Sequence, residues 1–98
     1  MSETVCSRDP IEDIGHGVRV ERRYLNGHFE GVAYWHPRPD GKGECNGWIA
    51  FRQKWADGWD LVSTQPLHVE PSLLCRACGH HGFIRGGRWV TSAPGPIG

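Results

Sequence analysis

Alternating apolar and polar residues between positions 17 and 35, GVRVERRYLNGHFEGVAYW, predict an antiparallel β-hairpin. Asn26-Gly27 is a strong signal for its two-residue turn, because both residues tolerate the positive φ that such a turn demands. Pairing across the turn predicts an apolar face made of Tyr24 with Phe29, Val20 with Ala33 and Val18 with Trp35. The same register predicts a polar face made of Arg23 with Glu30 and Arg19 with Tyr34.

A second hairpin is predicted at residues 82–90, GFIRGGRWV, where Gly86-Gly87 forms the turn between Arg85 and Arg88. Ile84 then lies opposite Trp89. The chain between the hairpins contains short β-like runs bounded by Gly, Pro, Asp and Ser, namely GWIAF, GWDLVS, PLHV and SLLC. Only FRQKWAD, residues 51–57, could make a turn or two of helix. The pattern therefore predicts a mainly β chain, a small antiparallel fold of hairpins with long loops.

The length of 98 residues corresponds to one domain, which we expect over residues 15–91. Residues 1–14 are polar and acidic, which predicts a mobile N-terminal arm. The Pro- and Gly-rich residues 92–98 are expected to be a disordered tail. With 38% apolar residues the core is lean, so a metal or another cross-link is expected to contribute to stability.

Long apolar runs and the basic and apolar regions of a secretory signal are absent, so we expect no membrane association and a location in a bacterial cytoplasm. Closely spaced cysteines in a reducing compartment more often bind metal than form stable disulfides. Eleven basic and eleven acidic residues cancel, which argues against a domain that coats nucleic acid by bulk charge. The segment after Pro71 is basic, with Arg76, Arg85 and Arg88.

The segment LLCRACGHHGF, residues 73–83, predicts half of a zinc site. Cys75 and Cys78 have the spacing by which two thiolates converge on one ion while backbone N–H groups of the turn point at the sulfur atoms. Gly79 suits the left-handed backbone that often follows such a pair. A closed structural zinc site needs two further ligands.

We favour His81 as the third ligand and Cys45, in the Gly-rich segment GKGECNGW, as the fourth. His36 is the reserve candidate for the fourth position. His80 competes with His81, but adjacent residues in an extended stretch point in opposite directions, so only one of them is expected to bind. Cys6 is a weaker candidate because it lies in the expected arm.

Other interpretations of the cysteine pair remain open. A thioredoxin-like redox pair would open a helix in a βαβ unit, and a β run follows here instead. Two inert thiols without metal are a further alternative. A zinc hydrolase would need an open metal position with a base nearby, for which Glu44, Glu70 or His80 are available. No H-E-x-x-H or H-x-E…P-C-x-x-C arrangement is present, which argues against an enzyme.

The run PLHVEPSLLCRACGHHGFIRGGRWV, with GWIAF and GWDLVS before it, resembles a family of small uncharacterised phage and prophage proteins. In that family a P-S-[IL] stretch leads to a Cys/His cluster, then H-G-F-I or H-S-F-I, a short turn and G-x-W. The resemblance covers roughly residues 15–91 and implies Cys75, Cys78 and His81 as cluster residues. Larger relatives have additional Cys/His pairs. Some relatives are labelled ammonia monooxygenase, but this chain lacks the membrane spans and the copper or iron ligands of such an enzyme.

The resulting hypothesis is a non-enzymatic, zinc-stabilised β module of phage or prophage origin that binds a host or phage protein and so modulates a host protein or defence system. The expected contact residues are Arg76, Arg85, Arg88 and His80. The first alternative is a zinc protein that binds nucleic acid through the same arginines and nearby aromatic residues. The second alternative is a small zinc hydrolase.

Overall fold

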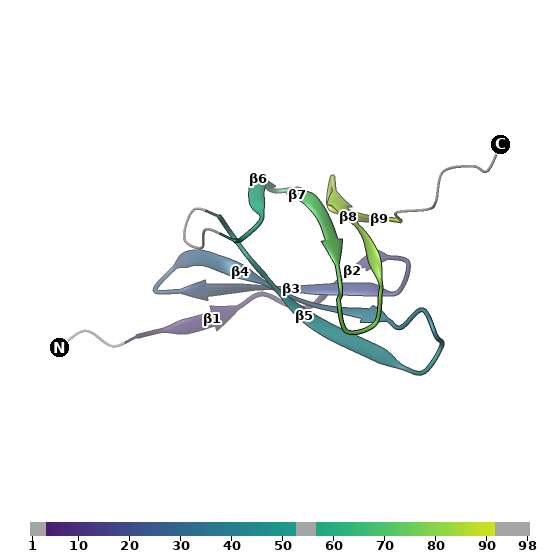
Figure 1. Ribbon diagram of the computed structural model, residues 1–98. Helices are drawn as coiled ribbons and strands as arrows, with labels where there is room; N and C mark the ends of the chain where they lie inside the picture. The colour runs from purple at the N-terminus through teal and green to yellow at the C-terminus, as the bar shows by residue number, and fades with distance from the viewer. Residues whose placement is uncertain (1–3, 53–56, 92–98) are drawn as a thin grey trace.

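The computed structural model describes residues 4–52 and 57–91, and these residues form two antiparallel β-sheets without a helix. The first sheet contains β1 (Cys6–Arg8), β2 (Glu12–Gly15), β3 (Val18–Leu25), β4 (His28–Pro37) and β5 (Glu44–Ala50). The second contains β6 (Asp60–Thr64), β7 (Leu67–Leu74), β8 (His81–Arg85) and β9 (Arg88–Thr91), in this order (Figure 1). The predicted fold class, a small antiparallel β fold of hairpins, is confirmed.

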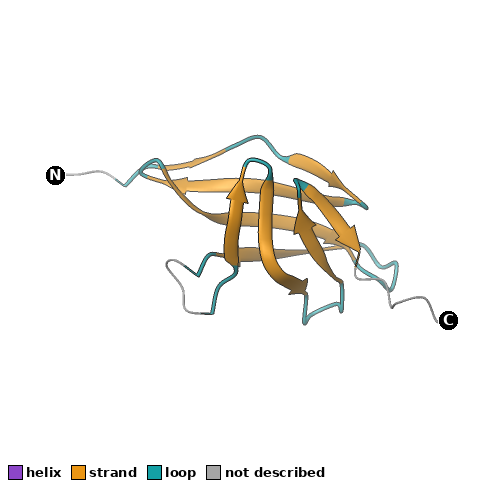
Figure 2. Cartoon of the chain, turned by 90° about the horizontal axis from the view of Figure 1, so that it is seen from above, coloured by secondary structure: helices purple, strands orange, loops and turns teal. Residues whose placement is uncertain are grey.

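The two sheets lie face to face, and the short strands of the second cross over the long strands of the first (Figure 2). The core fills the space between them. It draws on both sheets and consists of Ile14, Val18, Val20, Val32, Tyr34, Ile49 and Phe51 from the first and Leu67, Val69, Leu73, Ile84 and Trp89 from the second. Each sheet therefore buries one face, as alternating strands require.

The first hairpin begins in the predicted register and then departs from it. Tyr24 lies opposite Phe29 as predicted, but Arg23 lies opposite Gly31 and Arg19 opposite Trp35. The shift inserts Glu30 as an extra residue, which is a β-bulge. The predicted partners beyond the bulge, including Arg23 with Glu30 and Val20 with Ala33, are therefore wrong by one residue.

A one-residue shift moves every later side chain to the other face of the strand. Val32, Tyr34 and His36 are consequently buried in β4, whereas Ala33 and Trp35 are only half-buried. This change of face brings an imidazole into the interior. The inward-facing imidazole is that of His36.

The second hairpin has the predicted register, with Ile84 opposite Trp89 and Arg85 opposite Arg88. The hairpin requires glycine at position 82, because a Cβ atom there would lie 2.4 Å from the Trp89 ring. Trp89 is 3% exposed and closes the core at this end of the second sheet.

The N-terminal segment differs from the expected mobile arm, since β1 and β2 both pair with β3. Ile14 is buried between the sheets. Cys6 lies in β1 and is exposed. The core of the expected helical turn, residues 53–56, and the expected tail, residues 92–98, lie outside the described residues. Within the described ranges, no helix is long and apolar enough to cross a membrane.

Candidate metal centre

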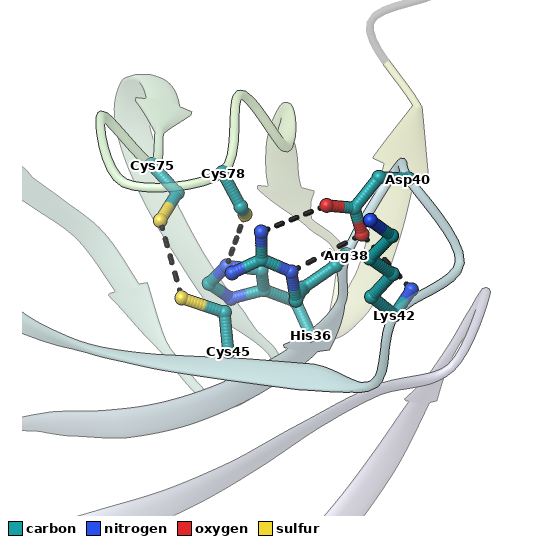
Figure 3. Close-up of polar contacts among 7 residues, drawn as sticks. All are labelled: His36, Arg38, Asp40, Lys42, Cys45, Cys75 and Cys78. Carbon is teal, nitrogen blue, oxygen red and sulfur yellow. Dashed lines mark hydrogen bonds and ion pairs between the residues drawn. The ribbon is translucent and has the colours of Figure 1, made fainter.

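Four side chains from three distant segments converge at one end of the contact between the sheets. The ligand atoms of His36, Cys45, Cys75 and Cys78 all lie within 4.8 Å of one another. Figure 3 shows Cys45 reaching up from the first sheet toward Cys75 and Cys78, which hang from the β7–β8 loop. The group is close enough to hold a metal ion and would join the two sheets.

The first sheet supplies His36 and Cys45 through its strand register. His36 on β4 is the direct antiparallel partner of Cys45 on β5. Directly paired residues project from the same face of a sheet with Cβ atoms about 5 Å apart. Because the bulge at Glu30 points His36 inward, the register also turns Cys45 toward the second sheet.

The second sheet supplies Cys75 and Cys78 through a tight loop. The Cys75 N–H donates to the His80 carbonyl at 2.8 Å, and the Gly79 N–H donates to the Cys75 carbonyl at 2.7 Å. Gly79 has a φ of 84°, the left-handed value that the sequence predicted for this position. The loop thus holds both sulfur atoms toward His36 and Cys45.

The distances within the group match a tetrahedral ion. The Cys45 and Cys75 sulfur atoms are 3.6 Å apart, and the Cys78 sulfur lies 3.4 Å from His36 Nε2. Tetrahedral zinc with ordinary bond lengths places two sulfur ligands about 3.8 Å apart and a sulfur and a nitrogen about 3.6 Å apart. These two pairs are therefore within a few tenths of an ångström of the spacing that a zinc ion requires, and the whole group lies within 4.8 Å. All four cysteines of the chain are free thiols in the structure.

The electrostatics of the sulfur atoms are uneven. Burial acts to raise the pKa of the Cys75 thiol, but the backbone N–H groups of Cys78 and Ala77 and the neighbouring thiols outweigh it, so the net pKa is lowered. The pKa of Cys45 is raised, first by its hydrogen bond with Cys75 and then by burial. The thiolate form is therefore favoured at Cys75 and disfavoured at Cys45, and N–H groups aimed at sulfur are what a metal-bound thiolate requires.

The His36 ring is completely buried, and burial followed by the charge of His80 lowers its pKa. A neutral imidazole is the form that binds metal. With Nε2 facing Cys78, the ring proton belongs on Nδ1, which has no hydrogen-bond partner within the described parts of the chain. The ring is held in place by stacking, because His80 lies over His36 with ring centroids 4.6 Å apart.

Aromatic residues pack against His36 and His80 on the buried side of the ligand group. Trp89 stacks on the other side of His80 at 4.8 Å, and Tyr34 packs against His36 at the same centroid distance. Gly47 makes room for Tyr34, since a Cβ atom there would lie 2.6 Å from its ring. Burial and then the neighbouring cysteines raise the pKa of Tyr34 to about 12, so it stays a neutral support.

A charged loop borders the group on its outer side (Figure 3). Arg38 donates to both carboxylate oxygens of Asp40 at 3.1 and 2.8 Å, and the Lys42 N–H donates to the same carboxylate at 2.9 Å. The pKa of Arg38 is raised, mainly by Asp40 and further by Cys78 and Cys45. A divalent ion with three thiolates would carry one negative charge, which this guanidinium offsets in part.

Three of the four favoured ligands are brought together, namely Cys45, Cys75 and Cys78. His81, the favoured third ligand, lies outside this group: it is exposed at the start of β8 and packs near Phe83. His36, the reserve candidate, takes its place. His80 is half-buried and supports His36 by stacking on its ring.

The arginines that the sequence singled out do not form one surface. Arg76 lies in the loop before β8, whereas Arg85 and Arg88 flank the turn at its far end. Arg85 is engaged, because its Nε donates to Glu70 at 2.9 Å and its guanidinium lies over Phe83. Arg76 is therefore separated from Arg85 and Arg88 by the length of β8.

Compared with protein-family models, curated proteins and solved structures, the chain matches none of them. The resemblance to phage and prophage proteins stays a prediction from the motifs.

Proposed function

We propose that this chain is a zinc-stabilised β module in which one structural ion joins the two sheets, and that the module binds another protein. The observation that carries the proposal is the convergence of His36, Cys45, Cys75 and Cys78 within 4.8 Å. These residues come from three segments that are distant in the sequence, and two of the distances between their ligand atoms, 3.6 and 3.4 Å, are close to those of a tetrahedral site.

Zinc is the ion that the donor set favours. Three thiolates and one imidazole form a soft tetrahedral environment, which zinc accepts without a preference of its own for geometry. Iron–sulfur clusters are usually held by four cysteines. A hard ion such as magnesium or calcium would select oxygen ligands.

Four protein ligands favour a structural ion over a catalytic one. A zinc hydrolase keeps one coordination position for water, with a general base beside it. Here the fourth position is taken by His36, which is completely buried. Glu70, one of the candidate bases, is engaged by His68 at 2.7 Å and by Arg85 at 2.9 Å.

The outer face of the second sheet supports the binding of a protein partner. Leu74 is 52% exposed and Val90 is 40% exposed, on strands either side of β8. They lie opposite His81 and Phe83, so the four side chains form a continuous strip across three strands. An apolar strip with a polar surround is typical of a protein-binding surface. A host or phage protein as the partner remains a proposal from the sequence resemblance.

Metal analysis of freshly purified protein tests the structural part of the proposal. We expect one zinc per chain, and we expect a strong chelator to unfold the β8–β9 hairpin, seen as loss of dispersed amide signals in NMR spectra. Re-addition of zinc should restore the fold. Substoichiometric metal, or a chelated protein with an unchanged spectrum, would refute the proposal.

The partner is tested by co-purification from a bacterial host. Wild-type chain should retain a protein in stoichiometric amount, and the double substitution Leu74→Glu, Val90→Glu should lose it. Ile11→Glu is the matched control, because Ile11 is 49% exposed but precedes the first sheet's β2. Equal retention by the double variant, or no retention by any form, would overturn this part.

A further inference from the structure

We propose that the metal centre is also a peroxide-sensitive clamp, in which oxidation joins Cys45 to Cys75 as a disulfide and releases the ion. This inference rests on the proposed zinc site and adds a mode of regulation to it. The disulfide would then link the two sheets in place of the metal ion, so the chain would stay folded after the ion is released.

The geometry selects the pair. The sulfur atoms of Cys45 and Cys75 lie 3.6 Å apart, whereas the Cys78 sulfur faces His36 Nε2 at 3.4 Å. A disulfide needs the two sulfur atoms at about 2 Å, so an approach of about 1.6 Å suffices. The β7–β8 loop carries Cys75 and can supply that movement with a side-chain rotation.

Access permits the reaction. Cys45, Cys75 and Cys78 are all half-buried, so a small oxidant can reach the sulfur atoms from solvent. His36 and the aromatic residues behind it are buried and close the inner side of the group. A hydroperoxide therefore meets the sulfur atoms and not the imidazole.

The chemistry balances with a hydroperoxide as the oxidant. One thiolate attacks the peroxide oxygen, which breaks the O–O bond and yields a sulfenic acid and hydroxide. The second thiolate attacks the sulfenic sulfur, forms the S–S bond and expels a second hydroxide. The two sulfur atoms are oxidised by two electrons in total, hydrogen peroxide is reduced to two water molecules, and two protons are consumed. Zinc loses two of its four ligands and is released.

The choice of pair has a structural consequence. A Cys45–Cys75 disulfide joins β5 of the first sheet to the end of β7 in the second. A Cys75–Cys78 disulfide would close within one loop and leave the sheets unlinked. A disulfide from Cys45 keeps the sheets linked after the ion departs, and the Cys75 sulfur, 3.6 Å away, is the partner that the geometry favours.

Trypsin separates the three possible disulfides, because Arg76 lies between Cys75 and Cys78. Cleavage after Lys and Arg places Cys45 in residues 43–52, Cys75 in residues 55–76 and Cys78 in residues 77–85. Each pairing therefore gives a different cross-linked peptide under non-reducing conditions. An uncut peptide over residues 55–85 counts as the pairing within the loop.

The experiment uses zinc-loaded protein with Cys6→Ser, which removes the exposed fourth thiol. Hydrogen peroxide is added in steps, zinc release is followed with a chromogenic chelator, and digests are analysed by mass spectrometry. We expect release of about one zinc per chain, linkage of residues 43–52 to 55–76, and a circular dichroism spectrum that stays folded. A reductant with added zinc should reverse all three changes.

Linkage of residues 77–85 to either 55–76 or 43–52, sulfinic acids without a disulfide, or unfolding on release would overturn the inference while the zinc site stands. Fresh protein without zinc would refute the proposed function itself, so the two failures are distinguishable.

Discussion

The two sheets are joined in two chemically different ways. At one place the ligand group joins β4 and β5 to the β7–β8 loop. Nearer the Asn26-Gly27 turn, Arg22 of β3 donates from Nη1 to the Thr64 carbonyl of β6 at 2.5 Å. The first junction needs an ion or a covalent bond. The second is made by the chain alone.

The arginine junction is a small buried network. Arg22 is 7% exposed, lies over the Phe29 ring at 5.6 Å and is 3.4 Å from a Glu12 carboxylate oxygen. Phe29 in turn packs edge-on against Phe51 at 5.0 Å. Its contribution is fixed, because an arginine stays charged under all ordinary conditions.

The two junctions differ in how far their contribution to stability depends on conditions. A bound ion can supply roughly 10–16 kcal/mol of apparent folding free energy, and this contribution depends on zinc supply and on thiol oxidation. The hydrogen bond of a charged group supplies about 1.5–3 kcal/mol and responds to neither condition. Because the core is lean and the zinc junction supplies much of the folding free energy, the stability of this fold should depend on zinc supply and on thiol oxidation.

The largest effect is expected from Cys75→Ser. Loss of one thiolate removes most of the zinc contribution, which is comparable with the whole stability of about 5–15 kcal/mol of an ordinary domain. The variant should be largely unfolded at 25 °C by circular dichroism and amide NMR. Cys6→Ser is the matched control and should change the free energy of unfolding by less than about 0.5 kcal/mol. A folded Cys75→Ser protein would show that the arginine junction and core suffice.

The next largest effect distinguishes His36 from His81 by their contributions to zinc affinity. His36→Ala should weaken zinc affinity by more than about 100-fold, beyond the range usual for residues that only support a ligand. His81→Ala should leave affinity unchanged, because His81 is exposed and outside the group. Chelator competition with a fluorescent zinc indicator measures both. The reverse ranking would restore His81 as the ligand and reject the observed register of β4.

A smaller effect is expected from Arg22→Met at the second junction. It removes the hydrogen bond to the Thr64 carbonyl and should cost about 2–3 kcal/mol in urea unfolding of the zinc-loaded protein. Zinc affinity should not change. A loss of zinc affinity in Arg22→Met would mean that the two junctions are coupled and not independent.

The smallest effect belongs to an ionic cluster outside both junctions. Arg85 and then His68 lower the pKa of Glu70 to about 2, below the value of about 4.3 for a free glutamate. The carboxylate therefore stabilises the fold above about pH 4.3, and this contribution is lost as the pH falls toward 2. Glu70→Gln should lower the urea midpoint slightly at pH 6, and the difference should narrow on acidification while both proteins remain folded. A difference that widens at low pH would contradict this sign.

The sequence predicted the fold class and the second hairpin, because Asn-Gly and Gly-Gly turns and alternation are local signals. It also selected Cys45, Cys75 and Cys78, since thiols are few and suit one soft ion. It misplaced His36 because the bulge at Glu30 reverses the faces of β4, and no alternation rule contains that extra residue. Gly31, a glycine inside a strand, was the available sign of a bulge.

The pairing of β1 and β2 with β3 also escaped sequence analysis. Cys6–Arg8 and Glu12–Gly15 are short and mostly exposed, so they carry little apolar pattern of their own. They are ordered by pairing with β3, and just before β1 the Asn26 side chain of the β3–β4 turn accepts from the Val5 N–H at 2.8 Å. Such long-range pairing has no local signature.

X-ray absorption at the zinc edge of the freshly purified protein tests the central claim most directly. We predict one zinc per chain with three sulfur ligands at about 2.3 Å and one nitrogen ligand at about 2.0–2.1 Å. A preparation without stoichiometric zinc, or a shell containing water oxygen in place of one of these ligands, would contradict the account.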